Sequence, residues 1–269
     1  MIRLYLSFSE VCTIVTISPV QDALFEKQLL NLAHQIKSSR HLVIFTGAGI
    51  STNSGLPDYR GRDGVWTRRR KGLSDKKVKP FSKFKPSNGH KAIYQLYKKG
   101  HLKFLVTQNI DNLHHKSGIP ETHLAEIHGN YNKLRCLSCD RRYTLKECNF
   151  NNNLPSLTNP TAGISNPKSC SCGGQVVPTY VNFGRPLLDK ELQLANDHAS
   201  KSDLFIAIGT TLNVEPASLL PKKAKNNGAY IVIINNDRTA YDLKADLIIQ
   251  GQIEDILPKL VSYVKRKST

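Results

Sequence analysis

The segment LVIFTGAGISTNSGLPDYRG, residues 42–61, decides the fold of this chain. Its opening residues, Leu42–Phe45, have the length and β-branched content of a buried strand, and a glycine-rich turn follows at once. Gly47 and Gly49 permit backbone angles closed to other residues and let a ligand approach the main chain. A strand that runs into such a turn is typical of sites that hold a phosphate group.

Polar residues after the turn support the same interpretation. Ser51 and Thr52 are suited to cap a following helix, whose amino end favours anions such as a nucleotide diphosphate. However, the segment lacks the third glycine of the full dinucleotide fingerprint, and no acidic residue is placed convincingly about 20 positions further on. Two interpretations therefore stay open here: a nucleotide site, and a plain strand-to-helix turn.

The rest of the chain alternates between strand and helix patterns. Apolar residues at helical spacing predict an amphipathic helix over Asp22–Lys37. Further helices are expected at His90–Lys99, Pro216–Asn226 and Ile253–Lys265, and further strands at Leu102–Thr107, Leu204–Gly209, Tyr230–Asn235 and Leu247–Ile249. This alternation predicts an α/β fold with a parallel sheet covered by helices on both faces. The segment Gly61–Pro86 is expected to be a basic loop with short helical turns.

The balance of charge is strongly basic. The chain of 269 residues has 38 Lys and Arg against 21 Asp and Glu, a net charge of +17, which attracts nucleic acid or acidic proteins. Nine of these cations fall between Arg68 and Lys85, opposed only by Asp75. The alternative is a solvated loop, since charge excess bears on non-specific binding rather than on chemistry. No run of about 18 apolar residues occurs, so no segment is expected to span a membrane.

Four of the six cysteines form two close pairs. The pairs are Cys136-x2-Cys139 and Cys170-x-Cys172, while Cys12 and Cys148 are expected to be spare thiols. Four thiolates are a sufficient set for tetrahedral zinc and leave no open position for water, so the sequence predicts a structural zinc of zinc-ribbon type. The long stretch between the pairs is tolerable because loop-closure entropy grows slowly with length.

The alternation of strand and helix patterns is interrupted between Tyr131 and Val177, where short polar turns surround the cysteine pairs. We therefore expect a zinc-binding module over residues 131–177, inserted into a discontinuous domain formed by residues 22–130 and 178–265. Residues 1–21 form an N-terminal extension, for which a strand, a weak organelle-targeting segment and a poorly ordered tail all stay open. No clean cleavage site follows this extension, so the chain is expected not to be secreted.

His128 stands just ahead of the zinc module and is a candidate general base. Histidine titrates near neutral pH, and clefts form where two modules meet. His114 and His115 compete for that role. Two further strand ends suit a nucleotide: Gly209-Thr210-Thr211 offers hydroxyls and free amides to a phosphate, and Asn235-Asn236-Asp237 suits ribose hydroxyls or forms a simple turn.

Taken together, these motifs resemble those of the sirtuins, the NAD-dependent protein deacylases. The matching segments are Gly47–Ser51, Gly55–Arg60, Thr107–Asp111, His128-Gly129, the four cysteines, Val181–Gly184 and Gly209–Thr211. The resemblance covers roughly residues 41–260 and implies a Rossmann-like NAD-binding domain with a smaller inserted zinc-ribbon module. The short basic link that follows Gly64 is most similar to the class IV branch, and the segment Val214–Ala217 is more similar to microbial members.

The resemblance implies an NAD-dependent protein-lysine deacetylase or deacylase, which transfers the acyl group of acyl-lysine to ADP-ribose and releases nicotinamide. It implies NAD and Zn2+ as cofactors, His128 as the base, and Asn109 and Asp111 as further catalytic residues. The implied cofactor-binding residues are Gly47, Ala48, Gly49, Tyr59, Arg60, Gln108, Asn109, Asp111, Gly209, Thr210, Thr211 and Asn235. The implied zinc ligands are Cys136, Cys139, Cys170 and Cys172.

The resemblance also implies how the substrate is held. An acyl-lysine peptide is expected to add as a strand between two segments, Val181-Asn182-Phe183-Gly184 and Leu212-Asn213-Val214. Three positions depart from the family pattern: Asn112 replaces a glycine, Tyr59 replaces a phenylalanine that covers nicotinamide, and Arg185 replaces a glutamate. The Tyr-x-x-Arg pair of acidic-acyl specialists is not recognisable, which argues against desuccinylation.

Two other functions stay open from the sequence. One is a protein mono-ADP-ribosyltransferase, and the other is a basic NAD- or ADP-ribose-binding chromatin or nucleic-acid module with little catalysis. A weak nucleic-acid or chromatin contact would use the basic surface. A cytoplasmic location is expected, with the nucleus as the alternative.

Overall fold

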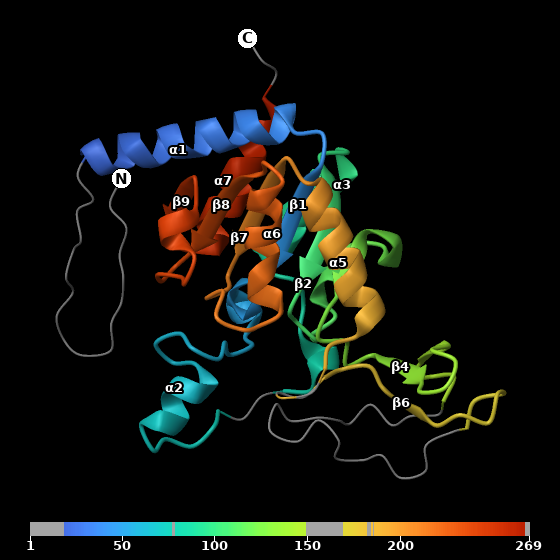
Figure 1. Ribbon diagram of the computed structural model, residues 1–269. Helices are drawn as coiled ribbons and strands as arrows, with labels where there is room; N and C mark the ends of the chain where they lie inside the picture. The colour runs from blue at the N-terminus through green and yellow to red at the C-terminus, as the bar shows by residue number, and fades with distance from the viewer. Residues whose placement is uncertain (1–18, 77–78, 149–168, 182–183, 185, 267–269) are drawn as a thin grey trace.

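A parallel sheet of six strands lies at the centre of the structure (Figure 1), a computed structural model that describes residues 19–76, 79–148, 169–181, 184 and 186–266. The strands are β1 (Leu42–Thr46), β2 (Leu102–Thr107), β3 (Leu124–Glu126), β7 (Leu204–Ile208), β8 (Tyr230–Asn235) and β9 (Leu247–Gln250). Their order across the sheet is β3-β2-β1-β7-β8-β9. The order reverses at β1, as in the doubly wound nucleotide-binding folds.

Strand β1 is central because both of its faces are apolar. All five of its residues are buried, and successive side chains enter opposite cores. Leu42 and Ile44 pack into the core on one face, whereas Val43 and Phe45 pack into the core on the other. Pairing with β2 and β7 in parallel register then fixes the position of the turn that follows β1.

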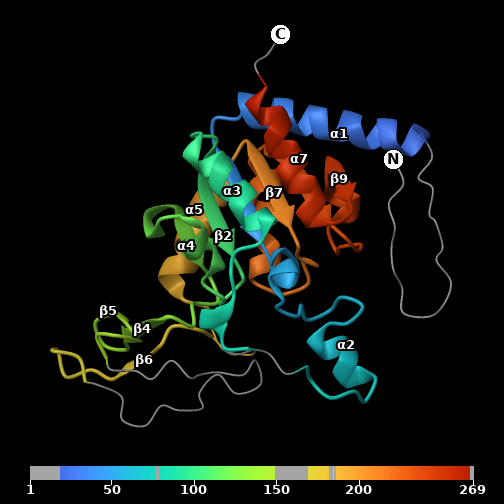
Figure 2. The same cartoon turned by 180° about the vertical axis from the view of Figure 1, so that it is seen from behind.

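Helices cover both faces of the sheet (Figures 1 and 2). One face carries α1 (Pro19–Ser38), α3 (Asn88–Lys98) and α7 (Ile253–Lys265), and the other carries α5 (Asp189–Lys201) and α6 (Leu220–Asn226). In both views α1 lies across one end of the molecule beside α7. The fold class predicted from the alternation of strands and helices is confirmed.

A second, antiparallel sheet lies apart from the first, on the side of Figure 1 where β4 and β6 are labelled. It consists of β4 (Lys133–Cys136), β5 (Arg142–Thr144) and β6 (Val176–Pro178), in the order β5-β4-β6. A small hydrophobic cluster that includes Leu134, Leu145 and Val176 supports it. These strands fall at the sequence positions expected for the zinc module, although the domain boundaries themselves stay a prediction.

Buried charges connect this module to the central sheet. The Glu126 carboxylate, at the end of β3, lies 2.8 Å from the Lys133 ammonium on β4 and 3.3 Å from the His115 imidazole. The backbone N–H of Glu126 donates to Glu191 on α5, and Arg142 on β5 lies 3.7 Å from the same Glu191 carboxylate. These contacts link the small sheet to the end of β3 and to α5.

Most of the elements predicted from periodicity are confirmed, some to the residue. The strands Leu102–Thr107 and Tyr230–Asn235 and the helix Ile253–Lys265 have the predicted bounds. The basic segment contains α2 (Val65–Arg70) and a 3-10 turn at Phe81–Lys83, as expected.

Outside the small module, one strand and two α-helices were not foreseen: β3, α4 (Leu113–Ser117) and α5. The first two are short. Helix α5 contacts the core mainly through two small side chains, Ala195 and Ala199, so its apolar pattern is weak.

Some of the sequence predictions lie outside the described residues. They concern the extension before residue 19, Cys12, the peptide-binding residues Asn182 and Phe183, and Arg185. Among the residues that are described, no helix has both the length and the apolar character needed to cross a membrane.

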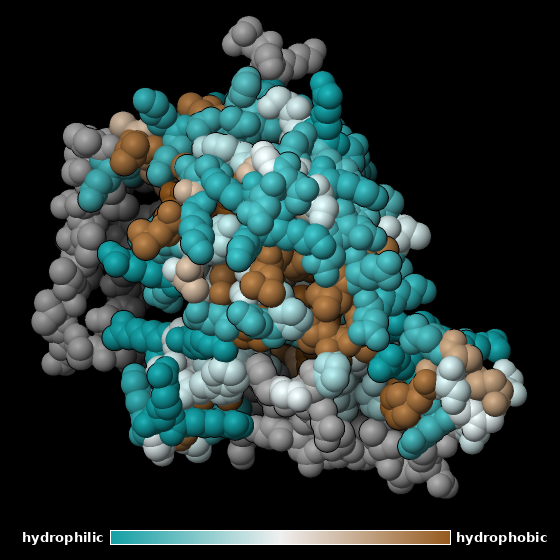
Figure 3. All heavy atoms as spheres, viewed as in Figure 1, coloured by the Kyte–Doolittle hydropathy of each residue, from teal (hydrophilic) through white to brown (hydrophobic). Residues whose placement is uncertain are grey.

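The face of the molecule seen in Figure 3 is mostly hydrophilic, as is expected because charged residues are mostly exposed in folded proteins. Hydrophobic residues gather near its centre, where α5 and α6 lie. Leu194 on α5 and Leu219 just before α6 are among the exposed large hydrophobic side chains, at 37% and 47% exposure.

Substitution of Phe45 tests the two-sided packing of β1. Phe45 is fully buried, with its ring centroid 6.1 Å from that of Phe205, so Phe45→Ala should lower the free energy of unfolding by about 3–5 kcal/mol. The exposed Leu243 offers a control, since Leu243→Ala should change stability by less than about 0.5 kcal/mol. Urea unfolding measures both, and equal losses in the two variants would contradict this account of the core.

Candidate active site

Two glycine turns, one after β1 and one after β7, pack directly against each other. Gly47 N donates to the carbonyl of Ile208 at 3.0 Å, and Gly49 N donates to that of Gly209 at 2.9 Å. A Cβ atom at Gly47 would lie 2.7 Å from the Gly209 oxygen, and one at Gly49 would lie 2.8 Å from the Gly209 Cα. Larger residues at either position would force the turns apart.

This contact corrects the reason given for the first glycine. Gly47 has φ −123°, which any residue can adopt, so unusual backbone angles do not explain it. Gly209 does have a positive φ, +64°, and a Cβ there would lie 2.6 Å from the backbone nitrogen of Ile50. The glycines are required because two backbones approach closely at the point where the strand order reverses.

The predicted caps Ser51 and Thr52 are also used differently. Residues Ala48–Ser54 form a 3-10 helix that begins at Gly47 without a side-chain cap. The Ser51 hydroxyl donates to Asp111 Oδ2 at 2.6 Å, and Thr52 Oγ1 donates to the carbonyl of Gly49 at 3.0 Å. The expectation that they cap a following helix is therefore wrong, because both lie inside the first turns of that segment.

A cavity of about 610 Å³ opens beside these turns, where β1, β2, β7 and β8 end. Its lining includes every residue proposed from the sequence for catalysis or cofactor binding: Gly47, Ala48, Gly49, Tyr59, Arg60, Gln108, Asn109, Asp111, His128, Gly209, Thr210, Thr211 and Asn235. Residues from the beginning, the middle and the end of the chain thus share one hollow. This is where doubly wound sheets bind nucleotides.

Hydrogen bonds join the polar side chains after β2 to both glycine turns. Gln108 Nε2 donates to Thr210 Oγ1 at 2.8 Å, and Asn109 Nδ2 donates to the carbonyl of Gly47 at 3.1 Å. Asn109 Nδ2 also lies 3.2 Å from Ser51 Oγ. Two amide side chains are therefore held in place before any ligand binds.

Asp111 is buried at the inner end of the cavity. Burial raises the pKa of its carboxyl, while the hydrogen bonds from the Ser51 hydroxyl and the Leu113 N–H act in the opposite direction. Those two donors satisfy one carboxylate oxygen each. The side chain is fixed in orientation and accepts only a small number of further contacts.

The imidazole of His128 reaches the same cavity from the loop after β3. Its Nδ1 lies 2.8 Å from the carbonyl oxygen of Gln108, which can only accept, so Nδ1 carries the proton. In the neutral ring Nε2 then has the free lone pair. Burial lowers the pKa of His128, which keeps the ring neutral at physiological pH.

The competing histidines have other roles. His114 is buried, with Nε2 2.9 Å from the hydroxyl of Thr46, and His115 pairs with Glu126. Neither lines the cavity, where His128 is the only histidine among the described residues.

The aromatic lid of the cavity comes from the segment after the 3-10 helix. Tyr59 meets Trp66 edge to face, with ring centroids 5.8 Å apart, and the Arg60 guanidinium lies 4.3 Å from the centroid of the Trp66 ring. Trp66 lines the cavity together with Tyr180. No local pattern in the sequence distinguishes these two rings from ordinary core aromatics.

Asn112 takes the place of a glycine without disturbing the turn. Its φ is +61°, in the left-handed region that asparagine tolerates better than most residues. Its side-chain oxygen accepts a hydrogen bond from Asn130 Nδ2 at 2.8 Å. The substitution is therefore compatible with the site and adds a link to the loop that carries His128.

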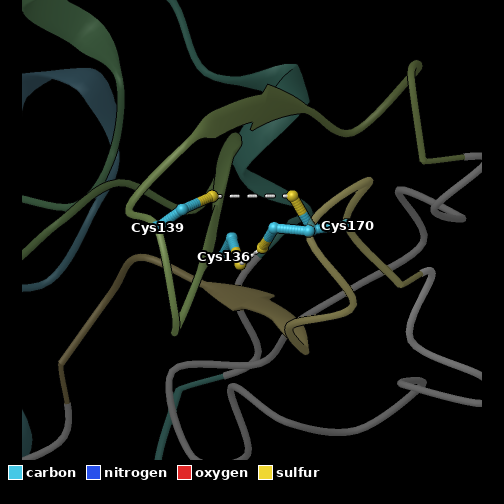
Figure 4. Close-up of side chains that lie close together, drawn as sticks. Cys136, Cys139 and Cys170 are labelled. Carbon is cyan, nitrogen blue, oxygen red and sulfur yellow. Dashed lines mark hydrogen bonds between the residues drawn. The ribbon is translucent and has the colours of Figure 1, made fainter.

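Four cysteines converge in the small module, and Figure 4 shows three of their side chains pointing toward one another. The sulfur atoms of Cys136, Cys139, Cys170 and Cys172 all lie within 4.8 Å of one another, with the Cys136–Cys172 and Cys139–Cys170 distances both 3.6 Å. Tetrahedral zinc with Zn–S bonds of about 2.3 Å places its sulfurs about 3.8 Å apart, so this set fits the ion. Cys148 lies outside the set and packs against the neighbouring hydrophobic cluster.

Fold and cavity together define a dinucleotide-binding α/β protein with an inserted structural zinc module. A model of the Sir2 family matches residues 73–216. The rice (Oryza sativa subsp. indica) protein named NAD-dependent protein deacetylase SRT1 is 38% identical over 240 residues, which cover 87% of this chain and 47% of the rice protein. The protein named NAD-dependent protein deacetylase from Thermodesulfovibrio yellowstonii is 35% identical over 262 residues, covering 91% of this chain and 98% of that protein.

Solved structures similar to this chain point to the same family. A chain from a study of the mechanism and regulation of Sir2 enzymes has a TM-score of 0.68 and 33% identity, covering 89% of this chain and 98% of its own. A complex described as Sir2 with a p53 peptide and NAD+ has a TM-score of 0.66 and 28% identity, covering 86% and 96%. The chain belongs to the Sir2 family, and the family predicted from the motifs is confirmed.

The match differs in extent between relatives. The chain spans about half the length of the rice protein, but nearly the whole of the Thermodesulfovibrio protein. Its branch within the family stays a prediction.

Removal of one thiolate tests the zinc site. Cys170 is buried and its sulfur accepts from the Tyr143 hydroxyl at 2.8 Å, so Cys170→Ser should lose the metal and lower the midpoint of thermal unfolding. Cys148→Ser is the matched control and should keep stoichiometric zinc. Elemental analysis of the purified chains measures the difference, and full zinc occupancy in Cys170→Ser would contradict the assignment.

Proposed function

We propose that this chain is an NAD-dependent protein-lysine deacetylase, which transfers the acyl group of acyl-lysine to ADP-ribose and releases nicotinamide. The observation that carries the proposal is His128, whose Nε2 lone pair is free in a cavity lined by the two glycine turns. The names of the relatives, which are NAD-dependent protein deacetylases, support it.

The residues that line the cavity fit a dinucleotide. Ala48 and Thr210 line the cavity beside the two glycine turns, where a diphosphate would be held. The Arg60 guanidinium supplies a positive charge at the same cavity. Asn235 lines the cavity and donates its amide to the carbonyl of Asp237 at 2.8 Å, which leaves its side-chain oxygen for a ribose hydroxyl.

Asn109 and Asp111 would orient the nicotinamide end of NAD. Both are buried and restrained by Ser51, so they present fixed polar atoms to the nicotinamide ribose and carboxamide. Tyr59 covers that end, and burial raises the pKa of its hydroxyl so that it stays neutral. NAD, when bound, supplies the ribose carbon that the acyl oxygen attacks as nicotinamide leaves.

His128 then moves the proton. Its Nε2 accepts the proton of a ribose hydroxyl, while Nδ1–H keeps its bond to the Gln108 carbonyl and so holds the ring in one tautomer. That hydroxyl would then attack the acyl carbon, and with one water molecule consumed the acyl group would end on ADP-ribose as lysine leaves as the free amine. The base is needed only in its neutral form.

The peptide is proposed to enter as a strand between the Val181–Gly184 and Leu212–Val214 segments. Val181, Gly184 and Val214 line the cavity, and Val181 N donates to the carbonyl of His128 at 2.9 Å. An extended substrate placed there would bring its acyl-lysine beside the base, with main-chain bonds that make little demand on sequence.

A panel of acetylated and longer-chain acylated peptides, incubated with NAD and read by mass spectrometry, tests the proposed reaction. Nicotinamide and acyl-ADP-ribose should appear only with an acylated peptide, and His128→Ala should lower the rate by at least about 100-fold because the proton acceptor is lost. His34→Ala is the control: it alters an exposed histidine on α1, outside the cavity, and should leave the rate unchanged. No turnover across the panel, or covalent label from NAD on the peptide without deacylation, would overturn the proposal.

The pH profile tests the electrostatics of His128. An unperturbed histidine has a pKa of about 6.5, and burial lowers that of His128 in the folded chain. The neutral base therefore persists to lower pH, so the acid limb of kcat/KM should have its midpoint below about pH 6.5. A midpoint at or above that value would show that the imidazole is not desolvated as the structure indicates.

A further inference from the structure

A second hollow, of about 500 Å³, lies on the other side of the 3-10 helix that follows β1. It is bounded by the end of that helix, by the segment before α3 and by the first turn of α3 itself. Four lysines line it: Lys79, Lys83, Lys85 and Lys91. Asn53 lines both hollows, but none of the residues proposed above for catalysis or NAD binding lines this one.

The lysine charges in this hollow are not neutralised by the protein. Within the described part of the chain, the ammonium groups of Lys79, Lys83 and Lys85 make no ion pair or hydrogen bond, and that of Lys91 only approaches Asn88 Oδ1 at 3.4 Å. Nearby cations behave differently, since Arg69 forms a bidentate pair with Asp75 at 2.9 and 2.6 Å. Unpaired like charges gathered around a concavity favour an anionic ligand.

One carboxylate, Glu254, lines the hollow, and its oxygens have other partners. They accept the backbone N–H groups of Asn88 at 2.8 Å and of Gly89 at 3.2 Å. Glu254 therefore satisfies the amino end of α3 rather than a lysine. Its charge offsets only part of the positive charge around the hollow.

The backbone that carries Lys83 and Lys85 is held in place from behind. The ammonium group of Lys116 donates to the carbonyls of Phe81, Ser82 and Phe84 at 3.1, 3.2 and 3.1 Å. Phe81 and Phe84 are buried in one hydrophobic cluster, and Phe84 also lines the hollow. The lysines thus project from a fixed backbone, which lowers the entropic cost of gathering them around a ligand.

A hydroxyl in the wall of the hollow also lacks a partner. Ser54 Oγ is buried and has no hydrogen-bond partner among the described residues. An unsatisfied buried hydroxyl costs free energy, and an anion oxygen in the hollow would accept its proton.

We propose that this hollow is a binding site for an oligophosphate, separate from the NAD cavity. Several lysines spread around one concavity match a ligand with several negative charges better than a single monoanion, and lysine binds phosphate as a point charge. The Ser54 hydroxyl supplies a directional contact to one phosphate oxygen.

Calorimetric titration of the full chain with inorganic tripolyphosphate tests the site, with ADP-ribose present at saturation to block the NAD cavity. Lys83→Gln/Lys85→Gln should weaken binding by at least about tenfold, which corresponds to about 1.4 kcal/mol. Lys222→Gln/Lys223→Gln removes the same charge from α6, on the opposite face of the sheet, and should change the affinity by less than about twofold because distant exposed charges are screened.

Ser54→Ala distinguishes specific binding of the anion from non-specific electrostatic attraction to the lysines. It leaves the charge unchanged, so a several-fold weaker tripolyphosphate affinity would support a specific contact, whereas an unchanged affinity would contradict it. Equal weakening in the two lysine double variants, or loss of binding when ADP-ribose is added, would overturn the proposal. Displacement of tripolyphosphate by duplex DNA is the last measurement. If DNA displaces it from the unaltered chain but not from Lys222→Gln/Lys223→Gln, the binding would instead belong to a surface for nucleic acid. None of these outcomes depends on deacetylation, so the proposed function stands or falls separately.

Discussion

The contact between the two glycine turns is the constraint on which the site depends. Strands β1 and β7 are neighbours at the point where the strand order reverses, and the turns that follow them meet with Gly49 Cα close to the Gly209 backbone. Two polar side chains after β2 are then positioned against this junction: Gln108 through Thr210, and Asn109 through Gly47. A side chain at either turn would separate β1 from β7 and move all of these groups together.

The position of His128 depends on a second set of contacts, at the boundary of the zinc module. The residue after His128 is Gly129, which has φ +78°, and a Cβ there would lie 2.1 Å from the Thr179 carbonyl oxygen. Asn130 N donates to Thr179 Oγ1, and this hydroxyl donates in turn to the Asn130 carbonyl, both at 3.0 Å. Because Thr179 directly follows β6, the zinc ion would orient the base indirectly, by holding the strand that its loop packs against.

The elements predicted from the sequence are those whose pattern lies in a few neighbouring residues. Those that depend on contacts between distant residues were not predicted. A few consecutive residues were enough to predict each of the strands β1, β7 and β8 from its apolar run, and the zinc ligands from the cysteine spacing. The family motifs then predicted which cofactor binds at the ends of these strands. The hydrogen bond from Ser51 to Asp111, by contrast, joins residues 60 positions apart, so a capping role was the natural local reading. Trp66 and α5 were missed for the same reason: a lone aromatic and two alanines become informative only once their neighbours are known.

Burial favours the neutral form of both ionisable groups of the site, and it therefore shifts their pKa values in opposite directions. It lowers the pKa of His128 and raises that of Asp111, favouring the neutral form of each. For His128 the neutral form is the working base, so burial serves the reaction without a ligand. Asp111 has no ion pair among the described residues; the donors Ser51 and Leu113 stabilise its charge, with a smaller contribution from Lys116. A cationic ring placed beside this carboxylate would favour its ionised form, so the desolvation that prepares the base also creates a preference for a positively charged ligand.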